Sequence, residues 1–115
     1  MDEDEHEEPN VTLAYVQYMK LLRRTKGLQA MRTLFRYARI DQRAGHQIYV
    51  ANAKLHMSAD NGAFICLSVL REGLKTYGDT PGYVDAYLDH LLHIPEHQNT
   101  RVLRFDAFVL LCRFL

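Results

Sequence analysis

The stretch Ile48-Tyr49-Val50-Ala51-Asn52-Ala53-Lys54 decides the fold, because related stretches lie on both sides of it at one fixed distance. Tyr15, Tyr49 and Tyr83 are each 34 residues apart, and a valine follows the tyrosine in all three stretches. Each stretch is apolar and helix-like, and a second such stretch follows it after a turn. A helix pair of about 34 residues cannot bury its own apolar face, so pairs of this length stack on one another. The repeat therefore predicts an all-α solenoid of antiparallel helix pairs.

The second helices of the pairs repeat less regularly than the first. Phe35 and Leu70 are 35 residues apart, and a small residue, Ala38 or Gly73, follows each of them three positions later. Small side chains suit places where two helices approach closely. We expect each tyrosine ring to pack between the two helices of its own pair. The predicted repeat core consists of Tyr15, Phe35, Tyr49, Leu70 and Tyr83.

Turn and capping residues divide the chain into helices. We expect helices over residues 13–25, 28–40, 46–57, 63–77 and 81–93, and a sixth from about residue 99. The first should have Leu13, Val16, Tyr18 or Met19, Leu21 and Leu22 on its inner face. Asn10 or Thr12 is a candidate N-cap, and Gly27 a left-handed C-terminal cap. In Gly78-Asp79-Thr80-Pro81, glycine ends one helix, threonine can cap the next, and proline is tolerated in its first turn, so this segment marks a repeat boundary.

Composition bounds the size and the class of the protein. A chain of 115 residues is one domain at most, and its 14 basic and 14 acidic residues give a net charge of zero. The charges are segregated, however. We predict an acidic N-terminal segment over residues 1–10 and a repeat region over residues 11–115 with about two and a half to three repeats, whose first pair is rich in lysine and arginine.

No constellation in the sequence points to catalysis, a cofactor or a small-molecule substrate. Phosphate-binding loops, nucleophile elbows and zinc-binding helix motifs are absent from the sequence. His90, His93 and His97 have helical spacing, but Pro95 should break the helix between the second and the third, so we expect no metal site. Cys66 and Cys112 lie in apolar stretches, which predicts buried, unreactive thiols in a reducing compartment. We therefore predict that the protein is not an enzyme.

Neither end of the sequence has the pattern of a secretory signal or of a membrane-spanning helix. The N-terminus has no secretory signal, and the longest apolar run, from Phe105 onward, is too short to span a bilayer. We therefore expect a soluble intracellular protein without a membrane partner. If residues 105–115 form a helix, it carries one wide apolar stripe. We expect this tail to fold back on the fifth helix near Leu88, Leu91 and Leu92, or to mediate self-association.

Four arginines of the first pair have helical spacing. Arg32, Arg36, Arg39 and Arg43 lie three or four residues apart, and Tyr37 beside them could stack on a base. The same arginines could instead bridge acidic residues on an adjacent helix or in the N-terminal segment. We favour this contact with acidic groups over RNA, since phosphate binding normally needs a wider positive field than a neutral chain supplies.

Several stretches occur in a recognisable order between about Leu13 and Leu103. They are Val16-Gln17-Tyr18-Met19-Lys20 with Arg23-Arg24, Ala38-Arg39, His46-Gln47-Ile48-Tyr49-Val50, Gly73-Leu74-Lys75-Thr76-Tyr77-Gly78-Asp79, Tyr83-Val84-Asp85-Ala86-Tyr87-Leu88-Asp89, and Asn99-Thr100-Arg101-Val102-Leu103. This collinear series resembles the HAT (half-a-TPR) repeats of the large scaffold subunit of cleavage stimulation factor, the suppressor of forked family. The aromatic first helix and the Arg-x-Leu-Phe of residues 32–35 suit the HAT type better than general tetratricopeptide repeats. The pattern is lost after Leu103, where Arg104 replaces an aromatic.

The resemblance carries implications for function. The family is longer, so the chain resembles a fragment of its C-terminal repeat block, a HAT/TPR-like superhelix. It implies a non-catalytic nuclear scaffold in mRNA 3′-end processing that self-associates and holds other subunits of the cleavage and polyadenylation machinery, with RNA contacted mainly indirectly. The alternatives are a HAT scaffold of the spliceosome or of pre-rRNA processing, and a direct RNA-binding module using the basic first pair.

Overall fold

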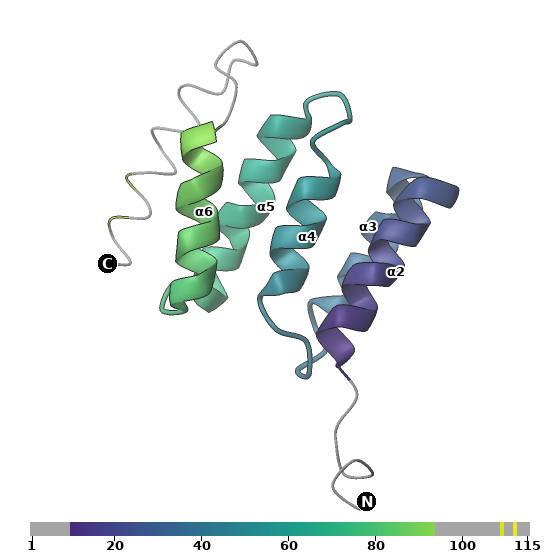
Figure 1. Ribbon diagram of the computed structural model, residues 1–115, viewed down its shortest axis with the longest axis horizontal. Helices are drawn as coiled ribbons and strands as arrows, with labels where there is room; N and C mark the ends of the chain where they lie inside the picture. Colours follow the sequence, from purple (N-terminus) through teal and green to yellow (C-terminus); the bar gives the residue numbers. More distant parts are fainter. Residues whose placement is uncertain (1–9, 94–108, 110–111, 113–115) are drawn as a thin grey trace, which may run out of the picture.

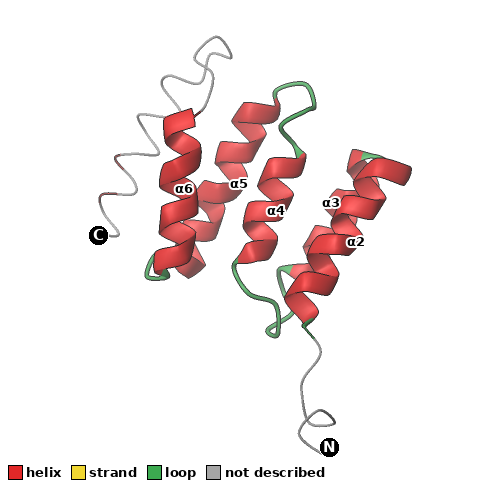
Figure 2. Ribbon diagram, viewed as in Figure 1, coloured by secondary structure: helices red, strands yellow, loops and turns green. Residues whose placement is uncertain are grey.

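The computed structural model describes residues 10–93, together with Val109 and Cys112. Five helices follow one another in residues 10–93, and this part of the chain contains no strand (Figure 2). They are α2 (Val11–Thr25), α3 (Leu28–Ala38), α4 (Gln47–Leu55), α5 (Gly62–Tyr77) and α6 (Pro81–His93). The prediction of an all-α fold is confirmed.

The helices are arranged as stacked antiparallel pairs. α2 packs on α3, and α4 packs on α5, while α6 packs on α5 and also contacts α4. The first helices α2, α4 and α6 lie side by side in one layer, with α3 and α5 behind them (Figure 1). The first two pairs are therefore joined mainly through α2 and α4, whereas α6 joins the second pair mainly through α5.

Local backbone features explain where the helices begin and end. Asn10 is the N-cap of α2, because its Oδ1 accepts a hydrogen bond from the Leu13 amide at 2.9 Å. Gly27 has the expected positive φ of 97°, but its ψ of −177° lies outside the left-handed helical region. Asn61 is left-handed in the turn before α5. At the start of α6, the backbone carbonyl of Thr80 accepts hydrogen bonds from the amides of Tyr83 and Val84, with N···O distances of 3.0 and 3.1 Å.

Hydrogen bonds between the first two pairs hold both ends of α2 against the second pair. Near its start, Thr12 Oγ1 accepts a hydrogen bond from the Gly45 amide at 2.8 Å. Near its end, Arg23 donates from Nε to the Leu55 carbonyl at 3.2 Å and from Nη2 to Ser58 Oγ at 3.1 Å. Thr12 thus links two pairs and does not cap its own helix.

The core runs continuously through the described helices. Its buried apolar members include Met19, Met31, Ile48, Leu67 and Tyr87. The predicted inner face of α2 is only partly correct. Met19 is buried, but Leu13 and Leu21 are 51% and 44% exposed, because no described element covers these two side chains.

Some predictions concern the C-terminal part of the chain. The sixth helix and most of the tail lie outside the described residues. Cys112 is exposed, so the prediction that both thiols are buried is wrong for this one. On α6, where we expected the tail to pack, Leu91 is buried, whereas Leu92 is 78% exposed. None of the described helices has the length and apolarity that crossing a membrane requires.

Candidate interaction surface

The three period-defining tyrosines all lie near the start of a first helix. Tyr49 and Tyr83 are buried, and Tyr15 is half-buried. We predicted that each ring would lie between the two helices of its own pair. The Tyr49 ring also contacts the preceding pair. The Tyr49 ring makes an edge contact with Phe35 of the preceding pair at 5.1 Å between centroids, and another with Tyr77 of its own pair at 5.7 Å. The repeated tyrosine therefore joins consecutive pairs.

Tyr83 forms the same kind of joint one repeat later. Its hydroxyl donates to the backbone carbonyl of Leu70 in α5 at 2.6 Å, and its ring lies 5.6 Å from that of Tyr77. Burial raises the pKa of the hydroxyl well above its usual range. A Cβ on Gly73 would overlap the Tyr83 hydroxyl and its ring carbon Cζ. This close approach is the reason for the small residue expected three positions after Leu70.

Tyr15 is anchored differently, because no described pair precedes it. Its hydroxyl donates to Asp41 Oδ2 at 2.7 Å, and Asp41 also accepts from the Arg43 guanidinium at 2.8 Å. The hydrogen bond to Asp41 raises the pKa of Tyr15, while the hydrogen bonds from Arg43 hold the pKa of the Asp41 carboxyl well below its usual range. Tyr15 thus fixes the loop that connects the first pair to α4.

The four arginines predicted for one flank do not form one surface. Arg32 is half-buried, and Arg43 lies in the loop beyond α3, paired with Asp41. Arg36 and Arg39 are exposed at the C-terminal end of α3, with Tyr37, 65% exposed, between them. Of the proposed flank, only Arg36 and Arg39 present an exposed guanidinium without an acidic partner among the described residues.

Cys66 lies beside His90, but its thiol is buried and not in its reactive form. The Cys66 thiol lies 3.1 Å from His90 Nε2, but it is fully buried, and burial raises its pKa to about 12. At neutral pH the thiol is protonated and therefore a poor nucleophile, as predicted for this cysteine. No three described His, Cys, Asp or Glu side chains come together as metal ligands. His97 and the side chain of His93 lie outside the described residues.

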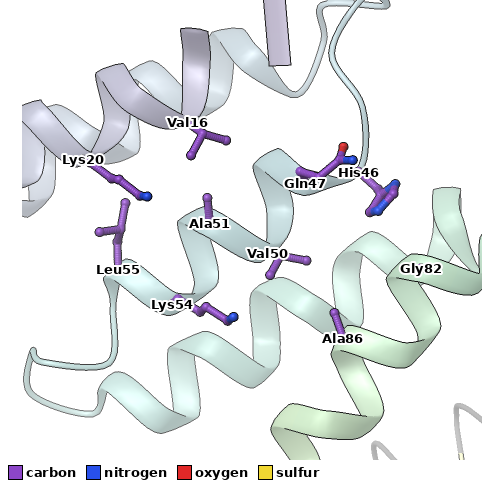
Figure 3. Close-up of a pocket in the computed structure, with 10 residues that line it drawn as sticks. All are labelled: Val16, Lys20, His46, Gln47, Val50, Ala51, Lys54, Leu55, Gly82 and Ala86. Carbon is purple, nitrogen blue, oxygen red and sulfur yellow. The ribbon is translucent and has the colours of Figure 1, made fainter. Parts of the chain in front are cut away.

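A groove of about 460 Å³ crosses the layer of first helices. Its apolar lining comes from all three helices, with Val16 on α2, Val50, Ala51 and Leu55 on α4, and Ala86 on α6. Figure 3 shows Lys20 and Lys54 at one end of this groove and His46 and Gln47 at the other. The groove combines an apolar floor with basic side chains and contains no carboxylate, so it suits a ligand with apolar and acidic groups.

The sequence analysis named several of these residues as repeat or family positions, but it did not predict that they line a common groove. One signal was available in the period itself, because Lys20 and Lys54 are 34 residues apart, as are Val16 and Val50. A position that repeats with the helix pairs points in the same direction from each first helix. The third stretch does not continue this signal, because Leu88 occupies the position of the lysine. The small residues Gly82 and Ala86 also do not repeat in the first two stretches.

Comparison with known proteins identifies relatives of the chain. A family model described as Suppressor of forked protein (Suf) matches residues 2–111. Protein suppressor of forked of Drosophila melanogaster is 42% identical over 92 residues, which are 80% of this chain and 12% of that protein. The mRNA 3′-end-processing protein rna14 of Schizosaccharomyces pombe is 33% identical over 80% of this chain and 13% of its own length.

A plant relative shows the same coverage. Cleavage stimulation factor subunit 77 of Arabidopsis thaliana is 33% identical over 92 residues, again 80% of this chain and 12% of that protein. The chain thus spans about an eighth of the length of these relatives. The family match over residues 2–111 includes all the helices described above.

Proposed function

Because the chain belongs to the suppressor of forked family, we propose that it is a non-catalytic scaffold in mRNA 3′-end processing. The observation that carries this proposal is the match of the family model to residues 2–111, almost the whole chain. Relatives from fission yeast and Arabidopsis are named for 3′-end processing and for cleavage stimulation factor. On this proposal the chain acts in the nucleus and binds other subunits of the cleavage and polyadenylation machinery.

The architecture supports a scaffolding role for this segment. Stacked helix pairs present an extended surface whose parts keep a fixed spacing, which suits the binding of protein partners. The tyrosine joints at Tyr49 and Tyr83 hold consecutive pairs together through buried aromatic contacts. We further propose that α6 is the first helix of a third pair, so that residues 11–115 hold between two and a half and three repeats after an acidic segment.

We also propose that the exposed side of α2 mediates self-association. Tyr18 and Leu21 are 51% and 44% exposed and, three residues apart, share one side of the helix. This side is where a preceding pair would pack in a longer solenoid. Contiguous apolar surface of this kind normally marks an interface. A second copy of the chain is the proposed occupant, because an exposed apolar side of a repeat helix is suited to pack against an equivalent helix.

Recovery of partners from nuclear extract tests the scaffold proposal. The tagged chain is incubated with the extract, bound proteins are identified by mass spectrometry, and the recovered fraction is assayed for cleavage of an RNA carrying a polyadenylation signal. An unrelated helical-repeat protein of similar length is the control. We expect 3′-end-processing subunits and cleavage activity to be enriched. Enrichment of only spliceosomal or pre-rRNA-processing proteins would instead support another RNA-processing scaffold.

A salt series with labelled uridine-rich RNA addresses direct RNA binding by the purified chain. Exposed Arg36, Tyr37 and Arg39 are the residues that would carry such binding. The double variant Arg36→Ala/Arg39→Ala is compared with Arg24→Ala, another exposed arginine. We expect weak binding with little difference between the variants. Tight binding that falls steeply with salt and is lost only in the double variant would favour an RNA-binding module.

A further inference from the structure

We propose that the groove between α2, α4 and α6 binds a short peptide segment of a partner protein that carries both acidic and apolar side chains. This inference rests on the proposed scaffold function and assigns the chemistry of one partner. The groove's volume of about 460 Å³ is in the range of sites that enclose a ligand or a few side chains. Its three contributing helices belong to three successive pairs, so a bound segment would bridge them.

The charge of the groove favours an acidic ligand. Lys20 and Lys54 occupy equivalent positions of the first two pairs and are exposed. Neither lysine forms an ion pair with a described residue, and the lining contributes no carboxylate. Two ammonium groups beside one apolar surface attract carboxylates more strongly than a single surface lysine does.

The floor of the groove favours apolar side chains. Val16, Val50 and Ala51 offer no polar group that could read a base or a sugar. Gly82 and Ala86 lie one turn apart on α6, and their small size leaves room on the side that faces Val50. Burial of apolar side chains in this space would supply affinity, while Lys20 and Lys54 would orient the acidic groups.

The same observations argue against RNA as the ligand of this groove. Single-stranded RNA is usually held by aromatic planes on which bases stack, combined with basic groups along the backbone. None of the lining residues is a phenylalanine, tyrosine or tryptophan. The exposed Tyr37 is on α3 and does not belong to the lining. The groove therefore fits a peptide better than a nucleic acid.

A library of random twelve-residue peptides displayed on phage tests the proposal against the purified chain. We expect selected peptides to be enriched in Asp or Glu together with Leu, Ile, Val or Phe. A representative peptide should bind with an affinity in the micromolar range, about −8 kcal/mol or weaker, and bind less tightly at high salt. Failure to enrich this composition overturns the proposal.

Matched variants locate the binding site for the selected peptide. Lys20→Glu/Lys54→Glu should weaken binding at least tenfold, whereas Lys26→Glu, outside the lining, should not. Ala86→Leu fills the groove without changing its charge, and we expect a similar loss. Circular dichroism verifies that each variant remains helical. Undiminished binding to folded Ala86→Leu, or to the folded lysine variant, would overturn the assignment to this groove.

Two competitors distinguish the proposed ligand from other acidic molecules. A synthetic peptide of residues 1–9, which is acidic but almost without apolar side chains, should compete poorly, as should uridine-rich RNA. Equally strong competition by either would show that charge alone selects the ligand, and would overturn the role of the floor. Because these assays use purified components, their failure would leave recovery of the 3′-end machinery from extract unaffected, and the reverse also holds.

Discussion

Single residues at the boundary between pairs hold the stack together. Phe35, Tyr49, Tyr77 and Tyr83 form a run of ring contacts with centroid distances of 5.1–6.4 Å, most of them edge-on. Edge contacts of this kind add about 0.5–1.5 kcal/mol to the burial of each ring. The run crosses from α3 through α4 and α5 to α6, so it links elements that are far apart in the sequence.

Replacement of Gly73 tests the close approach at the Tyr83 joint. We expect Gly73→Ala to lower the free energy of unfolding by about 1–3 kcal/mol, because the added methyl overlaps the Tyr83 hydroxyl and ring. Urea unfolding followed by circular dichroism measures the loss. Gly82→Ala is the matched control, since that glycine is exposed in a helix and alanine there should be neutral or slightly stabilising.

A double-mutant cycle with Tyr83→Phe separates the overlap from a general effect on α5. Removal of the hydroxyl deletes its hydrogen bond to Leu70 but also gives the new methyl space. The two substitutions should therefore cost less together than the sum of their separate losses. Simple additivity would mean that the alanine at residue 73 does not meet Tyr83.

Buried His56 predicts a dependence of stability on pH. The side chain is 2% exposed, and burial, followed by the charges of Arg32 and Arg23, lowers its pKa. The unfolded state then binds the proton more readily than the folded state, with a pKa of about 6.5. This contribution to stability should be complete above about pH 6.5 and should be lost as the pH falls from there toward the lowered pKa of the folded state. His56→Gln should flatten this dependence, and an unchanged slope would exclude His56 as its source.

At the scale of the helix, hydrophobic periodicity and turn residues predicted most of the helix positions. Pro81 and Gly78 placed the α5–α6 boundary correctly, because their backbone restrictions act locally. The inner face of α2 was harder to predict, since Leu13 and Leu21 have the spacing of core residues and only the neighbouring elements determine what is covered. The helical spacing of Arg43 groups it with the arginines of α3 in the sequence, but α3 ends at Ala38 and the Arg43 guanidinium pairs with Asp41 in the loop.

The groove was missed for a related reason. Lys20 and Lys54 are visible in the repeat, but a hollow depends on how far apart the first helices lie and on small side chains opposite them. Ala86 reads as an ordinary helix former in the sequence, and only its position across from Val50 gives it a role. Periodicity identifies equivalent positions, whereas the space between helices follows from packing.

The N-cap of α2 gives a prediction at this scale. Asn10→Ala removes the acceptor for the Leu13 amide and should cost about 1 kcal/mol of unfolding free energy. Asn10→Asp keeps a side-chain oxygen there and should retain most of the stability. Urea unfolding compares the two variants. Equal losses would show that the side-chain hydrogen bond contributes little to the start of α2.

For the whole molecule, the exposed side of α2 predicts association between copies. The variant Tyr18→Glu/Leu21→Glu should shift the sedimentation behaviour of the chain toward monomer at tens of micromolar, about the range of weak interfaces. Leu92→Glu changes a leucine on α6 that is 78% exposed and serves as the control. A wild-type chain that sediments as a stable monomer would contradict the proposed self-association through α2.

The tyrosine joints also bear on the order in which the chain acquires its structure. Tyr49 contacts a ring on α3, and Tyr83 contacts a carbonyl and a glycine on α5, so the receiving site of each joint precedes its tyrosine in the sequence. During synthesis the N-terminal parts emerge first. Each receiving site is therefore available before the ring that fills it leaves the ribosome, and the growing chain can add one helix at a time to a surface that is already formed.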